Sequence, residues 1–327
     1  MDNTDRKLLA LLGANPRMQY LELAKRLGIS RQAVYHRMKV MKEAGVVQGA
    51  YASVSIPYLD AIPVAIYGRS ETESVEETLD ELGRSEFTRR VVVAGGNYVY
   101  VIGILRKISE LDGYAGFVRR TAEIQEPTVG IYNLDHELMP YPVDGSGKRK
   151  EVYKKLSPLD LAIVASLKDD ARKSIADIAD AVGVTAKTIR RHLNDMISEG
   201  SLDLHMPQDL ASAGDLFLIM HVHLMDGADR TEVARRLLSR RHFQGQYIRT
   251  FSNHPGLLVW VFWSDKITEI RRALKTTGDD EDVRSVSVNF AYLERIYPTW
   301  RDKLPPTLSR PSENAGTPRT PSGHRSR

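Results

Sequence analysis

Apolar residues recur at helical spacing in two stretches of the chain. The first stretch holds three apolar stripes, made of Leu8, Leu9, Leu11 and Leu12, then Leu23, Ala24 and Leu27, and finally Val34, Met38 and Met41. Apolar positions three or four residues apart are typical of a helix with one buried face. The stretch therefore predicts three short helices that share one core, with the third helix ending at Gly45.

The second stretch is a copy of the first. A shift that places Asp5 on Asp160 superimposes residues 5–45 on residues 160–200 without a gap. The identical pairs include Asp5 and Asp160, Arg17 and Arg172, Ala24 and Ala179, Gly28 and Gly183, Met41 and Met196, and Gly45 and Gly200. A repeat of this length exceeds the periods of solenoid proteins and indicates a duplicated pair of domains.

Each copy has the pattern of a helix-turn-helix. The turns are Gly28-Ile29-Ser30 and Gly183-Val184-Thr185. In each turn the glycine can adopt a left-handed conformation, and the Ser or Thr can cap the next helix. A helix, a short glycine-containing turn and a second helix form a DNA-binding motif. The same spacing also fits a plain three-helix bundle without a DNA-binding role.

The outward face of the third helix points to DNA. With Val34, Met38 and Met41 facing inward, polar and basic side chains occupy the other side. The predicted DNA-binding residues are Ser30, Arg31, Gln32, Tyr35, His36, Arg37 and Lys39 in the first copy, and Thr185, Lys187, Thr188, Arg190, Arg191 and Asn194 in the second. Arginine and glutamine can read base edges through paired hydrogen bonds, whereas lysine and hydroxyl groups hold phosphates.

A small α+β unit follows each helix-turn-helix. Residues 46–55 are rich in β-forming side chains and predict a wing or a connecting strand. The next elements are expected at 64–67 (strand), 73–83 (helix), 90–93 and 98–105 (strands), 109–120 (helix) and 127–132 (strand). Those of the second copy are expected at 216–224 (strand), 231–241 (helix), 246–251 and 257–263 (strands), 265–275 (helix) and 283–292 (strand). This order, βαββαβ, predicts a ferredoxin-like unit.

The expected fold class is therefore α+β, a tandem repeat of a winged helix-turn-helix followed by a ferredoxin-like domain. The expected domains are residues 1–52 and 157–206 (helix-turn-helices), 60–140 and 214–300 (ferredoxin-like), 141–156 (linker) and 304–327 (a disordered basic tail). The tail contains almost no apolar residue, so it cannot bury enough surface to offset the entropy of ordering.

The first copy resembles the leucine-responsive/asparagine-type (Lrp/AsnC) family of transcription regulators. The resemblance rests on residues 5–9, 15–17, 23–30 and 43–47, and it is looser in the second copy. It implies an α+β domain that associates sheet to sheet and senses an amino acid or similar small metabolite. It also implies that single-copy members pair their helix-turn-helices by dimerising, a pairing that a tandem chain can achieve within one molecule.

The resemblance also places candidate effector contacts in the turns between the second and third strands of the α+β units. They are Gly95, Gly96, Asn97 and Tyr98 in the first copy and Asn253 and His254 in the second. Neither turn carries the aspartate that the family often has there. The same residues also fit a purely local role, because glycine and asparagine tolerate the positive φ angles of tight turns.

Composition and charge exclude several other classes. The chain has no cysteine, which excludes disulfides, thiolate zinc sites and a cysteine nucleophile. The tail from Leu304 onward contains four arginines and one acid, so it supplies +3 of the net charge of +4. Net charge therefore does not argue for DNA binding. His221 and His223 alternate along one strand and are expected to be structural, not metal ligands. We expect no cofactor and no enzymatic activity.

The expected function is thus a cytoplasmic, sequence-specific DNA-binding transcription regulator. Its expected partners are double-stranded DNA, an amino-acid or small-metabolite effector, and further copies of the chain in a homo-oligomer, because exposed sheet faces favour association. No apolar run is long enough to span a membrane, and residues 1–5 lack the pattern of a signal peptide. Two alternatives remain: a small-molecule sensor or interaction protein with degenerate DNA-binding domains, and a tetrapyrrole-modifying enzyme on the same fold.

Overall fold

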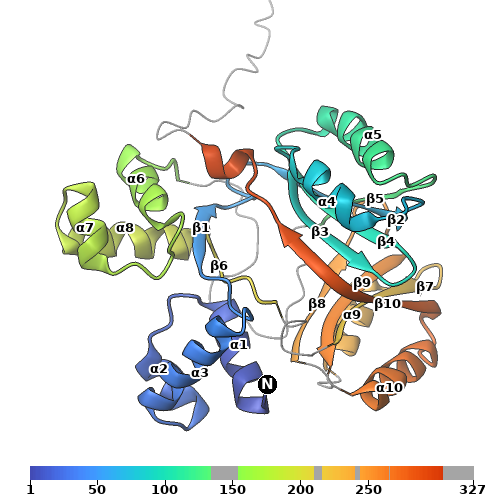
Figure 1. Cartoon of the computed structure of the whole chain (residues 1–327), viewed down its shortest axis with the longest axis horizontal. Coiled ribbons are helices and arrows are strands. Elements are labelled where there is room, and N and C mark those ends of the chain that lie inside the picture. Colours follow the sequence, from blue (N-terminus) through green and yellow to red (C-terminus); the bar gives the residue numbers. More distant parts are fainter. Residues whose placement is uncertain (134–153, 210–215, 240–243, 265, 305–327) are drawn as a thin grey trace, which may run out of the picture.

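The computed structural model describes residues 1–133, 154–209, 216–239, 244–264 and 266–304. Two helical bundles lie on one side of the molecule and a large sheet with outer helices on the other (Figure 1). The predicted linker and the predicted disordered tail lie outside the described residues, apart from residues 154–156 and Leu304. No helix among the described residues is long and apolar enough to span a membrane.

Both predicted three-helix units are present. Their helices are α1 (Asn3–Ala14), α2 (Tyr20–Leu27) and α3 (Arg31–Glu43) in the first copy, and α6 (Pro158–Leu167), α7 (Ile175–Val182) and α8 (Ala186–Glu199) in the second. Gly28 and Gly183 end α2 and α7 with φ angles of 68° and 78°, in the left-handed region. Ser30 and Thr185 then cap α3 and α8 by accepting hydrogen bonds from backbone N–H groups of the first turn.

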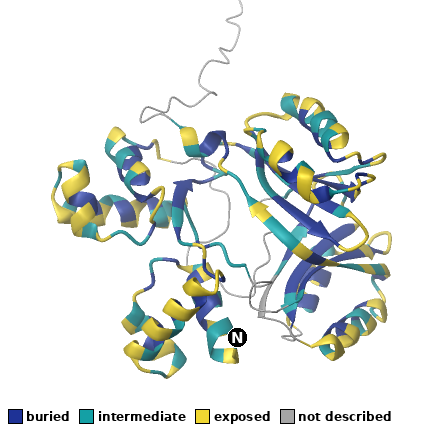
Figure 2. Cartoon of the chain, in the orientation of Figure 1, coloured by how far each residue is buried: buried dark blue, intermediate teal, exposed yellow. Residues whose placement is uncertain are grey.

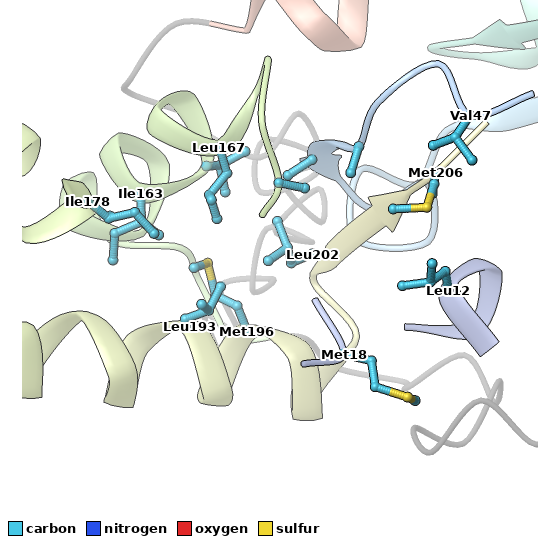
Figure 3. Close-up of a cluster of buried hydrophobic side chains, with 14 of the residues drawn as sticks. Leu12, Met18, Val47, Ile163, Leu167, Ile178, Leu193, Met196, Leu202 and Met206 are labelled. Atoms are coloured by element: carbon cyan, nitrogen blue, oxygen red, sulfur yellow. The ribbon is translucent and has the colours of Figure 1, made fainter. Parts of the chain in front are cut away.

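The two helix-turn-helices share one hydrophobic core. Strands β1 (Tyr51–Val54) and β6 (Leu202–His205) pair antiparallel between them, with Tyr51 opposite His205. The buried side chains run without interruption from Leu12 and Met18 of the first copy to Leu193 of the second (Figure 3). The strand expected within residues 46–55 is thus confirmed, but it pairs with the other copy of the repeat, which the sequence pattern did not predict.

Each ferredoxin-like unit has the predicted element order. The first contains β2 (Ile62–Arg69), α4 (Val75–Gly83), β3 (Thr88–Ala94), β4 (Tyr98–Leu105), the 3-10 turn η1 (Ile108–Glu110), α5 (Leu111–Thr121) and β5 (Thr128–Ile131). The second contains β7 (Leu216–Leu224), α9 (Arg230–Ser239), β8 (Gln244–Thr250), β9 (Leu257–Ser264), α10 (Ile267–Gly278) and β10 (Val283–Ile296), followed by the 3-10 turn η4 (Trp300–Lys303).

The two units form one sheet of eight strands in the order β5-β2-β4-β3-β10-β7-β9-β8. Strand β10 joins them because it is longer than its predicted range of 283–292, and its last residues pair with β3, Ile296 opposite Arg90. The outer edges also meet: Tyr132 bridges Phe251, and the N–H of Ser252 donates to the carbonyl of Ile131 at 2.8 Å. The two units are therefore joined at two seams, the β3–β10 pairing and the contact just beyond the ends of β5 and β8, the β5–β8 seam.

The inner faces of the two units pack against each other. Tyr67 and Tyr100 of the first unit lie in one buried cluster with Phe217, Phe251 and Val259 of the second, while the helices cover the outer faces. Burial of each large apolar side chain contributes about 1.5–3 kcal/mol. The homo-oligomer stays a prediction, but exposed sheet faces no longer support it, because these faces are covered within one chain.

Candidate nucleic-acid interface

The outer face of α3 carries most of the side chains predicted to bind DNA. Val34 and Met38 anchor the helix, with relative exposures of 0% and 1%. The exposed predicted residues are Ser30, Arg31, Gln32, Tyr35, His36 and Lys39. Figure 2 shows exposed positions, in yellow, along the helices of the first bundle. This helix thus presents paired hydrogen-bond donors and acceptors beside a lysine, the combination that can read bases and hold phosphate.

Arg37 differs from the other predicted residues of α3. Its Nη1 lies 2.7 Å from Oδ2 of Asp2 and 2.7 Å from Oδ1 of Asp5, at the start of α1. The hydrogen bonds that Arg37 donates to Asp5 and Asp2 raise its pKa. The pKa of Asp2 is lowered, chiefly by the backbone N–H of Asp5 and also by Arg37. Arg37 therefore fastens the recognition helix to α1, and its charge is already neutralised within the protein.

The outer face of α8 carries the second predicted set. Ile189, Leu193 and Met196 are buried below it. The exposed predicted residues are Thr185, Lys187, Arg190, Arg191 and Asn194. Thr188 is half-buried, and its Oγ1 lies 2.9 Å from Oγ1 of Thr185, so these two hydroxyls are partly engaged with each other.

His192 occupies in α8 the position that Arg37 has in α3. Its Nδ1 lies 2.7 Å from Oδ1 of Asp160, the counterpart of Asp5. Burial, the largest single effect, acts to raise the pKa of Asp160, but hydrogen bonds from Ser157 and His192 together lower it. The third helix of each copy thus contacts the same aspartate position of the first helix, through an arginine in the first copy and a histidine in the second.

The charges of the two helix-turn-helix units are unequal. Residues 1–48 contain nine Lys and Arg against four Asp and Glu, whereas residues 156–200 contain six against seven. Arg31 of α3 corresponds to Ala186 of α8, and Tyr35 corresponds to Arg190. The first helix-turn-helix therefore has the stronger attraction for a polyanion, and the two faces offer different side chains to the bases.

A reciprocal pair of arginines clasps the two bundles together. Arg17 donates through Nη2 to the carbonyl of Lys173 at 3.1 Å and through Nη1 to that of Ala171. Arg172, its counterpart in the repeat, donates through Nη2 to the carbonyl of Met18 at 3.1 Å and through Nη1 to that of Pro16. One feature of the sequence indicates a shared role for these arginines, because Arg17 and Arg172 occupy the same position of the repeat and are identical.

The first candidate effector turn is tightly bonded to its own surroundings. Gly96 and Asn97 have φ angles of 73° and 58°. Nδ2 of Asn97 donates to the carbonyl of Thr72 at 3.3 Å, and the N–H of Gly95 donates to the carbonyl of Phe290 at 2.9 Å. Tyr98, the fourth candidate, packs against the inner cluster of the sheet. The turn geometry and the β3–β10 seam account for these contacts.

The second candidate turn lies at the other seam. Oδ1 of Asn253 accepts from the N–H of Ile131 at 2.9 Å, and its Nδ2 donates to the carbonyl of Val129 at 2.7 Å. Nε2 of His254 lies 2.9 Å from the same carbonyl. The two predicted effector turns are thus placed at different seams, where their polar groups hold strands together.

His221 belongs to a small polar cluster between the two sheet faces. It is 7% exposed, and its Nε2 lies 2.9 Å from the hydroxyl of Tyr100, which in turn accepts from Nδ2 of Asn289 at 2.5 Å. Burial lowers the pKa of His221 to about 4, so the ring is neutral at pH 7. His223 is exposed, and within the described residues no three His, Asp or Glu side chains are grouped so as to hold a metal.

Two helix-turn-helices with exposed polar and basic third helices, joined through a β-ribbon, define a DNA-binding protein of the winged helix-turn-helix class. The family described as winged helix-turn-helix DNA-binding matches residues 1–48 and 156–200, the two units just described. Both recognition helices fall inside the matched segments.

Three curated relatives make the class more specific. The chain is 34% identical over 113 residues to the HTH-type transcriptional regulator Ptr1 of Methanocaldococcus jannaschii, covering 34% of this chain and 76% of that protein. It is 29% identical over 111 residues to the regulator LrpA of Pyrococcus horikoshii, covering 34% of this chain and 79% of that protein. Over 55 residues, 17% of this chain and 36% of that protein, it is 44% identical to the regulatory protein AsnC of Escherichia coli. The chain belongs to the Lrp/AsnC family of transcription regulators.

A solved structure matches the whole two-copy arrangement. The crystal structure of the siroheme decarboxylase NirDL superimposes with a TM-score of 0.57, covering 90% of this chain and 94% of that one at 15% identity. Its complex with an iron-uroporphyrin III analogue gives a TM-score of 0.58 at 14% identity, covering 92% of this chain and 95% of that one. At such identity the likeness concerns the fold alone.

Proposed function

We propose that this chain is a DNA-binding transcription regulator that reads a two-part site with two unequal recognition helices from one molecule. The observation that carries the proposal is the joint unit of the two helix-turn-helices, with their shared core, the β1–β6 ribbon and the Arg17–Arg172 clasp. This unit supports a fixed spacing of the two recognition faces. Paired helix-turn-helices contact half-sites about one helical turn apart, or a multiple of it.

The side chains assign a role to each helix. In α3, Arg31 and Gln32 are exposed near the N-terminus, where a recognition helix contacts base edges, and Lys39 stands about two turns further along for a phosphate. In α8, Lys187 corresponds to Gln32 and Asn194 to Lys39, and Arg190, the counterpart of Tyr35, adds an exposed cation to the same face. Because these sets differ, the proposed site is an imperfect palindrome whose α3 half binds more tightly.

Selection of bound sequences from a random duplex pool at near-physiological salt tests the proposal. We expect a two-part motif for the intact chain and loss of one half for an Arg31→Ala, Gln32→Ala variant. Arg84→Ala is the matched control, since Arg84 is exposed on the α4 side and pairs with Glu81, far from the recognition helices in sequence and fold. Salt-sensitive binding without any enriched motif would contradict sequence-specific reading.

The proposal includes modulation by an amino acid or related metabolite and association of several copies, as the family resemblance implies. Isothermal titration with a panel of amino acids tests the first, and sedimentation of the purified protein tests the second. The curated relatives are named as regulators, and a regulatory, cytoplasmic role is proposed here. Uptake of siroheme, followed by its visible absorbance, would instead favour tetrapyrrole chemistry.

A further inference from the structure

One arm of the arginine clasp also contacts a ring beside the first recognition surface. The guanidinium carbon of Arg172 lies 5.0 Å from the ring centroid of Tyr20, at the start of α2. The ring of Tyr20 in turn meets the ring of Tyr35 edge-on, with centroids 6.4 Å apart and planes at 67°. Tyr35 stands on the outer face of α3 and is 60% exposed. A line of contacts therefore runs from the second helix-turn-helix to the DNA-facing side of the first.

The opposite arm of the clasp has no such connection. The repeat counterparts of Arg172, Tyr20 and Tyr35 are Arg17, Ile175 and Arg190. Arg17 makes the same two kinds of carbonyl contact as Arg172, but the position of the first ring holds isoleucine. The chain thus contains its own matched comparison, with one arginine that contacts a ring and one that only clasps.

The Arg172 guanidinium is well suited to fix the Tyr20 ring. Its two carbonyl partners, on Pro16 and Met18, lie in the loop just before α2, so its position relative to Tyr20 is set by hydrogen bonds. A cation held over an aromatic face restrains the ring through its quadrupole. Tyr20 then limits the side-chain positions open to Tyr35, which is otherwise free to move in solvent.

We propose that Arg172 is a positioning residue for Tyr35, so that the second helix-turn-helix sharpens the base preference of the first. This inference rests on the proposed function, because it assumes that α3 reads DNA. Tyr35 offers an aromatic edge and a hydroxyl to the major groove, and holding the ring in one position favours one base over others. Loss of the restraint widens the choice of base at that step but leaves the remaining contacts of α3 in place.

The test measures binding to a set of duplexes that vary only at the base pair where Tyr35→Ala reduces discrimination most. We expect Arg172→Ala to reduce discrimination at that pair about two- to five-fold, the strength of one cation–π contact. Tyr20→Ile, which installs the residue of the second copy, is expected to give the same reduction while keeping both clasp hydrogen bonds. Arg17→Ala is expected to weaken binding to all duplexes equally.

Two results would overturn the inference. One is equal weakening across all duplexes by Arg172→Ala, with the preference at the Tyr35 pair intact. The other is a further loss of that preference when Arg172→Ala is added to Tyr35→Ala, because a residue that acts through Tyr35 has no effect once Tyr35 is gone. If the intact chain shows no base preference at any position, the proposed function is wrong, and the inference about Arg172 is wrong for that reason. Melting curves confirm that each variant is folded.

Discussion

Arg37 and His192 lie on helix faces that are expected to bind DNA, but their side chains stabilise the fold by pairing with the first helix of each copy. Both lie beside a buried stripe residue, Met38 or Leu193, at the boundary between the inner and outer faces of the helix. A helical pattern cannot say to which side a boundary residue turns. The partner decides: Asp5 and Asp160, near the N-terminus of the first helix of each copy, draw Arg37 and His192 inward.

Arg37→Ala is expected to lower the free energy of unfolding by about 1 kcal/mol, because the variant leaves Asp5 without a partially buried ion pair. Urea denaturation of the intact chain and the variant measures this. Arg31→Ala is the control and is expected to leave stability unchanged, since Arg31 is exposed at the surface. An equal loss for both variants would show that Arg37 has no special structural role.

His221 is expected to make the protein sensitive to acid. Its pKa is about 4 in the folded chain against 6.5 for the unperturbed ring. Between these values the unfolded chain binds a proton that the folded chain does not. The contribution of the neutral His221 ring to the free energy of unfolding is therefore complete above pH 6.5 and falls as the pH drops. The loss reaches about 3 kcal/mol at pH 4.

Chemical denaturation at pH 7 and at pH 4 checks this prediction. The difference in unfolding free energy between the two pH values should be smaller in His221→Gln, which has no ring to titrate. His36→Gln is the control, because His36 is exposed on α3. If the variant and the intact chain lose the same stability on acidification, burial of His221 is not the cause.

At the scale of single elements, local patterns predicted well and long-range pairings did not. The stripe of Val34, Met38 and Met41 predicted α3 because a helix is determined by neighbours three and four residues away. The sequence pattern predicts that the last strand ends at Tyr292, but β10 continues to Ile296 because β3, far away in sequence, pairs with it. No local pattern contains that partner.

The same limit applies to the site. The outward faces of α3 and α8 follow from helical geometry, so most of the predicted DNA-binding residues are exposed as expected. The β1–β6 ribbon and the Arg17–Arg172 clasp join segments from different copies of the repeat. They depend on how the two copies meet, which the duplication indicates but does not specify.

The β5–β8 seam offers a test of packing between elements. A Cβ added at Gly130 of β5 would overlap the ring of Phe251, which is 1% exposed. We expect Gly130→Ala to cost about 1–3 kcal/mol of stability, as overpacking in a well-packed core does. Thermal melting measures the cost.

Gly113→Ala is the matched control for that substitution. Gly113 lies in α5, and an added Cβ would meet no atom within 4 Å. We expect this variant to gain about 0.5–1 kcal/mol, since alanine favours a helix over glycine. If Gly130→Ala melted like the intact chain, the β5–β8 seam would be loose enough to absorb a methyl group.

At the scale of the whole molecule, the two faces that we propose to read DNA belong to a single chain. We expect a chain disabled in α3 by Arg31→Ala and Gln32→Ala, mixed with a chain disabled in α8 by Lys187→Ala and Arg190→Ala, not to restore binding to the two-part site. Each variant chain has only one working recognition helix. The core shared by its two helix-turn-helices prevents it from exchanging a helix-turn-helix with another chain.

Gel-shift titration of the mixture against each variant alone measures this. The intact chain at the same total concentration is the positive control. Recovery of tight binding in the mixture would mean that the two working faces come from different molecules, as in a conventional dimer.

The covalent fusion of two unequal readers has a directional consequence. A symmetric dimer sits on its site in two indistinguishable ways, so a neighbouring promoter cannot tell left from right. Here α3 and α8 carry different side chains, and the Arg17–Arg172 clasp holds them in a fixed order. If the proposed function holds, the bound protein has a polarity, and inverting the site in front of a gene would turn the same molecule to face the other way along the chromosome.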